Sequence, residues 1–211
     1  MTLLPRRSVK KIHATNLFIT TGITLLVAYC NHPSQVTEQV YVIMPLDTGN
    51  TWQYTKTFFS ADGVPSDTLV ATMTVVRAET LDSFPGFYVD DLIIGPPILD
   101  RVILANLVGG LYTATAQYVS PPRPPKISKA LPFPTFEGDS LTYFGYGICT
   151  RAVSDPVVVP AGAFRCIKYN VISDTDTVAI IWATPNVGLV RVSYLDGFVH
   201  ELYELRSFHV K

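Results

Sequence analysis

The first 29 residues of this 211-residue chain contain no acidic residue, and the chain as a whole contains only three cysteines. Four Lys and Arg residues stand near the start, and the apolar stretch Leu17–Tyr29 follows them and ends at Cys30. A basic start before a short apolar core is typical of a secretory signal peptide. The stretch falls short of the about 18–20 residues that a helix needs to cross a bilayer. The four cations argue against a buried N-terminal helix, so we predict that residues 1–29 are a signal peptide.

Cys30 is the predicted lipidation site. Bacterial lipoprotein signals read Leu-x-x-Cys with small residues just before the cysteine. Val27 and Ala28 fit this pattern, whereas Tyr29 is large for its position. The favoured interpretation is a protein anchored in the bacterial cell envelope, at the outer membrane or the cell surface, by lipid on Cys30. Two alternatives stay open, namely a secreted or periplasmic protein that is cleaved nearby and an uncleaved anchor.

Charge and hydrophobicity narrow the class of protein after the signal. All 17 acidic residues lie beyond residue 29, whereas four of the 16 Lys and Arg precede it, which leaves the remainder with a net charge of −5. Nucleic acid is therefore not expected as a partner. Hydrophobic residues make up 48% of the chain and charged residues 16%, which argues against disorder. We predict a tether over residues 30–40 and a single β-rich domain over residues 41–211.

Cysteine and histidine are too scarce and too scattered to suggest a metal site. No Cys or His lies at zinc-like spacing from Cys149 or Cys166. If Cys30 carries lipid, these two form an even pair in an oxidising compartment, where a disulfide is possible. The alternative is a pair of unbonded buried thiols, and the sequence leaves both open. No metal and no cofactor are expected.

A period of two residues dominates the chain and indicates half-buried strands. In Thr51–Phe59 the aromatic residues alternate with Thr and Gln, which predicts that Trp52 and Tyr54 are buried and that Thr51, Gln53 and Thr55 are exposed. A turn at residues 61–65 and a second alternating run complete a hairpin. Gly188–Leu205 reads as another hairpin that turns at Asp196-Gly197, a pair suited to a type I′ turn.

Further strands are predicted between these hairpins, and no segment reads as a long amphipathic helix. The expected strands are Phe87–Ile94, Leu99–Leu107, Leu111–Val119, Leu141–Val153, Phe164–Ile172 and Val178–Ala183, with a turn at Gly109-Gly110. A short helix over Ile98–Leu107 is an alternative that stays open. Six prolines in Ser120–Pro134 predict a stiff surface crossover. Docking to a polyproline-binding domain is the less favoured interpretation of that segment.

A ten-residue pattern occurs twice. Pro45–Tyr54 and Pro134–Tyr143 both read Pro-x-x-x-Gly-[Asn/Asp]-[Ser/Thr]-[Trp/Leu]-x-Tyr. Proline ends the preceding segment, glycine followed by Asn or Asp makes a tight turn, and the two large residues then face the core of a strand. The repeat suggests two similar lobes, about residues 41–119 and 134–211, joined by the crossover at 120–134. The predicted fold is all-β, with an antiparallel curved sheet or half-barrel.

The same motifs resemble a family of exported bacterial proteins and lipoproteins. Such proteins begin their mature domain with Pro-Leu-x-x-Gly-Asn-x-Trp-x-Tyr and continue with Val-Pro-Ala-Gly-x-Phe-x-Cys and Gly-Leu-Val-Arg. The chain has these patterns at Pro45–Tyr54, Val159–Cys166 and Gly188–Arg191. The resemblance implies an antiparallel β-rich domain like that of periplasmic lipoprotein carriers. It implies no activity and no catalytic residues.

Sequence signatures of catalysis are scarce. There is no Gly-x-Ser-x-Gly elbow, phosphate loop, dinucleotide fingerprint or zinc-binding helix. The predicted Asp196-Gly197 turn sets His200 opposite Ser193, but a triad also needs an orienting acid and an oxyanion hole. Adjacent Asp90 and Asp91 point to opposite faces of a strand, and Asp174 and Asp176 read as a solvated turn. No catalytic residue is assigned.

Glu201 falls on a mostly apolar face of the last predicted hairpin, which suggests a hydrogen-bonded partner or an edge position. The favoured function is a membrane-tethered, non-catalytic β domain outside the cytoplasm that binds an apolar ligand or a partner protein of the envelope. The alternative is an envelope hydrolase with dispersed site residues. A deep apolar cavity would favour a ligand, and a filled core with an apolar surface patch would favour a partner.

Overall fold

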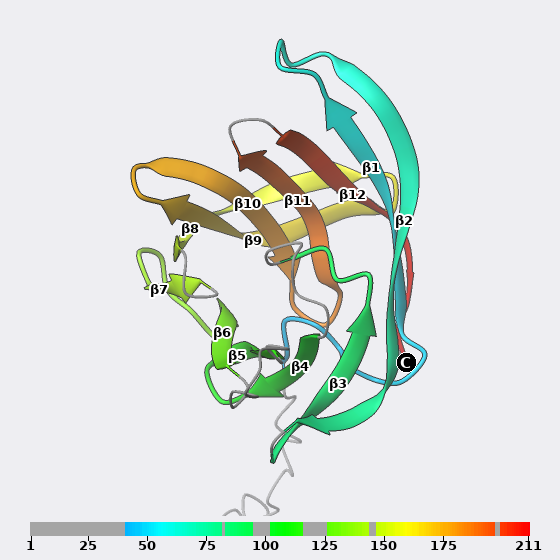
Figure 1. Cartoon of the computed structure of the whole chain (residues 1–211), viewed down its shortest axis with the longest axis vertical. Helices are drawn as coiled ribbons and strands as arrows, with labels where there is room; N and C mark the ends of the chain where they lie inside the picture. The colour runs from blue at the N-terminus through cyan, green and yellow to red at the C-terminus, as the bar shows by residue number, and fades with distance from the viewer. Residues whose placement is uncertain (1–40, 82, 95–101, 116–125, 144–146, 197–198) are drawn as a thin grey trace, which may run out of the picture. The chain divides into compact units, whose positions relative to one another are not determined.

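The computed structural model describes residues 41–81, 83–94, 102–115, 126–143, 147–196 and 199–211, and the chain from Tyr41 onward forms one compact unit. The predicted signal peptide and tether, with Cys30, lie outside the described residues. Twelve strands and no helix occur in the part that is described (Figure 1). The strands are β1 Thr51–Phe59, β2 Pro65–Leu81, β3 Phe84–Asp90, β4 Val102–Leu107, β5 Gly110–Thr115, β6 Lys126–Pro132, β7 Ser140–Tyr143, β8 Gly147–Val159, β9 Gly162–Ser173, β10 Asp176–Thr184, β11 Gly188–Asp196 and β12 Val199–His209.

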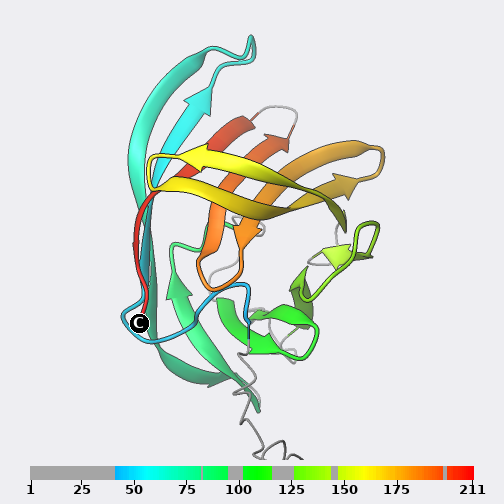
Figure 2. The ribbon, with the colours of Figure 1, turned by 180° about the vertical axis from the view of Figure 1, so that it is seen from behind.

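All twelve strands belong to one antiparallel sheet that is nearly closed. Its order is β6-β5-β4-β3-β2-β1-β12-β11-β10-β9-β8-β7, so two six-stranded meanders, β1–β6 and β7–β12, meet where β1 pairs with β12. The two edge strands, β6 and β7, follow each other in the chain. The sheet curls until Tyr169 of β9 donates a hydrogen bond to the carbonyl of Pro132 in β6, over 2.8 Å (Figure 2). The predicted all-β class with a curved antiparallel sheet is therefore correct.

The predicted aromatic face of β1 lies at the centre of the core. Trp52 and Tyr54 are fully buried, and both reach the second meander through hydrogen bonds to backbone carbonyls. The Trp52 indole donates to the oxygen of Val187 over 2.6 Å, and the Tyr54 hydroxyl donates to that of Leu189 over 3.0 Å. On the opposite face Gln53 is exposed, whereas the two flanking threonines are half-buried because β2 and β12 crowd β1 on both sides.

The repeated motif forms two equivalent corners of the sheet. Gly49 and Gly138 both have a positive φ, +91° and +86°, which a residue with a Cβ rarely adopts. In both corners the glycine N–H donates to a carbonyl of the following hairpin, that of Val75 or Arg151. The N–H of the same residue then donates back to the carbonyl of Asn50 or Asp139. The same local sequence therefore starts each six-stranded meander in the same way.

The long β8–β9 hairpin crosses one face of the neighbouring strands β10–β12, as Figures 1 and 2 show from opposite sides. Two hydrogen bonds hold its far end there. The Arg191 guanidinium donates to the carbonyl of Val158, and the N–H of Ala161 donates to the carbonyl of Leu205, each over 3.0 Å. The hairpin thus covers part of the core of the second meander.

Some expected elements differ from the structure. The proline-rich segment is not a crossover throughout, because Lys126–Pro132 forms β6, which pairs only with β5. An edge strand tolerates proline because one of its sides needs no ladder hydrogen bonds. The expected strand Leu141–Val153 is divided between β7 and β8, and the described part of Ile98–Leu107 is strand, so the helical alternative is wrong there.

We predict that Trp52→Ala lowers the free energy of unfolding by about 3–5 kcal/mol, because it removes a fully buried aromatic side chain and its hydrogen bond. Gln53→Ala is the matched control, since its side chain is exposed on the other face. Chemical denaturation measures both variants. A loss below about 1 kcal/mol for Trp52→Ala would contradict the central place of this side chain.

Candidate binding site at the free edge of β2

The β1–β2 hairpin projects beyond the strands beside it (Figure 1). β2 pairs with β1 from Pro65 to Thr74, but β3 pairs with β2 only from Thr74 onward. Within the described residues, the first half of β2 therefore has a free edge, and the whole stretch 60–70 is exposed. Two apolar side chains of this half, Leu69 and Val70, are 42% and 52% exposed.

A groove of about 490 Å³ lies beside this free edge. It is lined by Lys56, residues 69–72, residues 91–93 and Tyr203, and we call it the edge groove. Residues 69–72 are the free part of β2, and residues 91–93 follow β3 directly. β3 ends because Asp91 adopts a positive φ of +52°, which turns the chain away from β2.

The floor of the edge groove is a charged network on the inner face of β1 and β12. The Lys56 ammonium lies 2.9 Å from Glu201, and both side chains are only 18% exposed. Tyr203 donates to the same carboxylate over 2.8 Å, and the Lys56 ammonium lies over the rings of Phe58 and Tyr203. Burial, and then Glu201, raise the pKa of Tyr203, so the phenol stays protonated at neutral pH. Glu201 thus has the hydrogen-bonded partner that its place on an apolar face predicts.

One wall of the edge groove is fixed to the second meander. The Tyr194 hydroxyl donates to the carbonyl of Ile93 over 2.7 Å, and the side chains of Ile93 and Ile94 are buried. Tyr194 also packs edge-to-face against Tyr203, with ring centroids 6.2 Å apart. The floor and this wall are therefore joined, and they are held in place by strands far away in the sequence.

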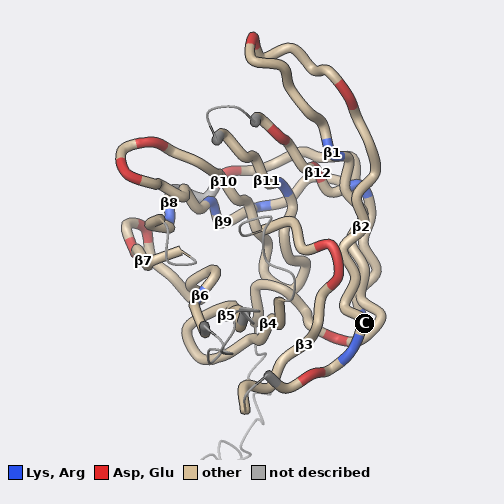
Figure 3. The backbone as a smooth tube through the Cα atoms, viewed as in Figure 1, with Lys and Arg blue, Asp and Glu red and all other residues tan. Residues whose placement is uncertain are grey.

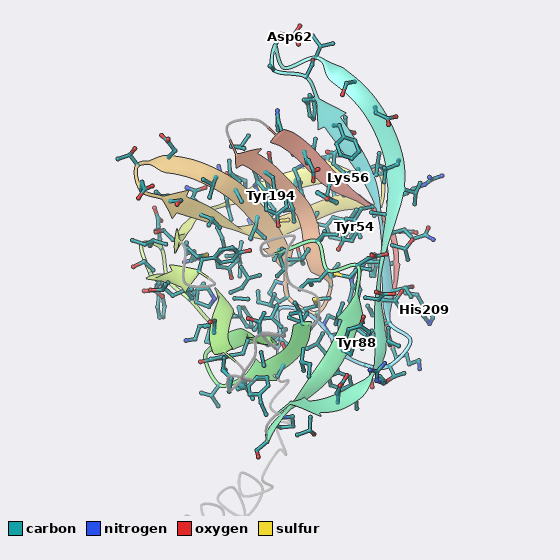
Figure 4. The ribbon with its side chains drawn as sticks, in the orientation of Figure 1. Tyr54, Lys56, Asp62, Tyr88, Tyr194 and His209 are labelled. Atoms are coloured by element: carbon teal, nitrogen blue, oxygen red, sulfur yellow. The ribbon has the colours of Figure 1, made fainter. Side chains whose placement is uncertain are left out.

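The rim of the edge groove and the hairpin beyond it are acidic. Asp91 lines the groove, and Asp62, Asp67 and Asp90 lie in the segments on either side of it. All four are exposed, and residues 60–72 and 90–94 contain no Lys or Arg. Figure 3 shows these acidic positions at the hairpin tip, along β2 and beyond the end of β3. Figure 4 places Asp62 at the tip of the hairpin and Lys56 nearer its base. A hydrogen bond from Ser60 lowers the pKa of Asp62, which therefore stays ionised.

The predicted contact between Ser193 and His200 is not formed. Pairing of β11 with β12 continues to Asp196 opposite Val199, so the register differs by two residues from the expected one. His200 lies opposite Leu195, and its ring stacks on Phe59 with centroids 4.3 Å apart. The Asp-Gly pair does not form the two-residue loop, because Asp196 still belongs to the ladder. Asp174 lies in the exposed turn between β9 and β10, as expected, and Asp176 is the first residue of β10.

Cys149 and Cys166 are buried free thiols, which is the second of the two alternatives for this pair. Cys149 of β8 lies opposite Val171, and Cys166 of β9 lies opposite Asp155. Six residues of extended β8 between Cys149 and Asp155 correspond to about 20 Å, whereas a disulfide needs α-carbons within about 7 Å. Burial raises the pKa of both thiols, that of Cys149 to about 12.

Metal-binding clusters of three or more His, Cys, Asp or Glu do not occur among the described residues. Nor does that part of the chain hold a helix long and apolar enough to cross a membrane. A second groove, of about 620 Å³, lies over β2, β3 and β4 beside Gly86. β2 and β3 pair along this groove, whereas the pairing of β3 with β4 is limited to Phe87–Leu104 and Tyr88–Ile103.

The fold defines an all-β protein built on one nearly closed, twelve-stranded antiparallel sheet. No protein-family model and no curated protein sequence matches the chain. Among solved structures, the chain is similar to a candidate lipoprotein from Parabacteroides distasonis ATCC 8503, at 17% identity and a TM-score of 0.43. That match covers 82% of this chain and all of the other. A candidate exported protein with a YmcC-like fold from Bacteroides fragilis NCTC 9343 matches at 16% identity and a TM-score of 0.36, over 81% of this chain and all of the other.

We predict that stability falls in alkali in part through Cys149. The pKa of this thiol rises on folding from 9.0 to about 12, so the folded chain keeps a proton that the unfolded chain loses in this window. The stabilising contribution is complete below about pH 9 and is lost as pH rises toward 12, with a slope of about 1.4 kcal/mol per pH unit. Denaturant melts between pH 8 and 10.5 should give a shallower slope for Cys149→Ala than for the unchanged chain. Equal slopes would contradict the prediction.

Proposed function

We propose that this protein is a lipoprotein of the bacterial envelope, tethered through Cys30, whose β domain binds a partner protein and does not catalyse a reaction. The basic start, the short apolar stretch and Cys30 support the export and the tether. The observation that carries the binding role is the edge groove, which combines a free strand edge, exposed apolar side chains and an acidic rim.

The buried side chains inside the sheet favour a partner protein at the surface over an apolar ligand enclosed in the interior. Large side chains from both meanders are fully buried inside the curled sheet, among them Trp52, Tyr54, Tyr143, Tyr169 and Ile181. An enclosed ligand would compete with these residues for volume. The edge groove is open, and an open groove with exposed apolar residues suits the surface of another protein.

The edge groove and the start of the domain lie toward opposite ends of β1. Val42 is held beside the turn between β10 and β11, through hydrogen bonds in both directions with Asn186. Trp52, near the start of β1, contacts that same turn at Val187, whereas the free edge of β2 flanks the other end of β1. The first described residues of the domain therefore lie toward the end of β1 away from the edge groove.

The tether is tested by Cys30→Ala in a bacterial host. We expect the unchanged protein to fractionate with membranes and to carry lipid by mass spectrometry, and the variant to lose both. Equal membrane association of the two proteins, with no lipid on either, would contradict the tether without touching the binding role.

The binding role is tested by a photo-crosslinking amino acid placed at Val70 in the full-length protein in cells. Val158 is the matched control, because it is 72% exposed and lies at the far end of the β8–β9 hairpin. We expect a discrete protein adduct from position 70 and none from position 158. Adducts from neither position, or the same adducts from both, would contradict a partner-binding role for this groove.

A further inference from the structure

The free half of β2 has the backbone of a strand that lacks one neighbour. Alternate residues of a strand direct their N–H and C=O groups to each side, and between Pro65 and Met73 the described structure pairs β2 with another strand only on the side toward β1. The N–H of Thr68 also donates to the carboxylate of its neighbour Asp67, over 2.7 Å. A free row of this kind is a template for the addition of another strand. Proteins commonly blunt such edges with Lys, Pro or a bulge. Here the one proline of β2, Pro65, and a shift in register between Pro65 and Asp67 both lie at the very start of the strand.

The side chains of this half of β2 also suit an added strand. Leu69 lies opposite Lys56, and Ala71 lies opposite Tyr54, so both share the face of the edge groove. An added strand would place every second side chain beside them and toward Tyr203 and Ile93, which also line the groove. The exposed Val70 offers a second, outer contact.

The charges around the groove select the partner. Among the described residues Lys56 is the only cation that lines the groove, and it pairs with Glu201. The four exposed aspartates of the rim and the hairpin have no described ion-pair partner. By its register Asp67 faces the groove from β2, and Asp91 lines the opposite wall. A second copy of this chain paired through the same edge would bring acidic rims together, which is unfavourable. An extended segment with Lys or Arg on its groove side would place its cations between Asp67 and Asp91, with their aliphatic stems on Leu69 and Ala71. Apolar side chains at the alternate positions would then lie beside Val70 on the outer face.

We infer that the edge groove binds an extended, cationic segment of a partner protein, which pairs with β2 as an additional strand. This inference rests on the proposed function, because it names the kind of partner and how it binds. It combines the three observations above: the unpaired backbone edge, the apolar groove face and the uncompensated acidic rim.

Fluorescence anisotropy on the folded domain, residues 41–211 or the full-length protein, tests the inference with three labelled ten-residue peptides. The first alternates Lys with Val, the second has Glu in place of Lys, and the third has proline in place of Val, which removes half of its backbone donors. We expect the Lys-Val peptide to bind at least tenfold more tightly than either of the others. Equal binding of the Lys-Val and proline peptides would reduce the contact to charge attraction and overturn strand addition.

Charge reversal on the protein supplies the matched control. The double substitution Asp67→Lys and Asp91→Lys should weaken binding of the Lys-Val peptide at least tenfold, whereas Asp176→Lys at the start of β10 should change it less than twofold. Equal effects of both changes would overturn the assignment to the edge groove. Self-association through β2, seen by sedimentation and lost in the double variant, would instead identify a second copy as the occupant and overturn the inference.

The experiments distinguish failure of the partner-binding role from failure of the strand-addition mode. A crosslinked partner at Val70 together with no preference for the Lys-Val peptide would leave the binding role standing and overturn the strand-addition mode. No adduct at Val70 together with specific peptide binding would support the groove as a strand acceptor and contradict the proposed partner-binding role in the cell.

Discussion

The pairing of β1 with β12 holds the two halves of the sheet together. In the described part of the chain it is the one ladder that joins the six strands β1–β6 to the six strands β7–β12. The side chains of β1 reinforce it, because Trp52 and Tyr54 pass into the second meander and satisfy two backbone carbonyls there. Each such buried hydrogen bond contributes about 1 kcal/mol, and a carbonyl left without its partner costs about as much or more. The ladder and the two aromatic residues thus make one core out of two halves.

The edge groove is a consequence of the same seam. Farther along β1, where the core opens to solvent, the inward position is filled by Lys56 in place of an apolar residue, and Glu201 of β12 neutralises it. The Lys56–Glu201 ion pair joins β1 to β12. Tyr203 bonds Glu201, and Tyr194, which packs against Tyr203, bonds the carbonyl of Ile93 in the segment after β3. Because β2 extends past the end of β3, its first half pairs only with β1. This half lies beside the groove that contains the Lys56–Glu201 pair.

Local sequence patterns were enough to predict most of the strands but not how the strands pair with one another. The alternation in Thr51–Phe59 predicted the buried face of β1, and the Gly-Asn and Gly-Asp pairs predicted the two corners, because both features depend on a few adjacent residues. β6 was missed because the prolines before it dominate the composition of its segment. The β11–β12 register was wrong by two residues because the turn signal at Asp196-Gly197 outweighed the continuing ladder.

The site itself was only half visible in the sequence. Lys56 and Glu201 each interrupt an apolar face, which marks both as unusual, but 144 residues separate them and no spacing rule connects them. The free edge depends on where β3 ends, at a left-handed Asp91, and on which strands flank β2. Such features come from tertiary pairing, which a single sequence does not reveal.

Residue-resolved amide hydrogen exchange of the folded protein shows whether β2 is paired on one side only beside a stable β1–β12 ladder. Amides of β1 and β12 in that ladder are expected to exchange only through global unfolding. Alternate amides between Ser66 and Thr72 are expected to exchange quickly, while the ones between them, which face β1, are protected. Uniform protection of residues 66–72, as strong as that of residues 75–80, would show a covered edge and rule out a half-paired β2.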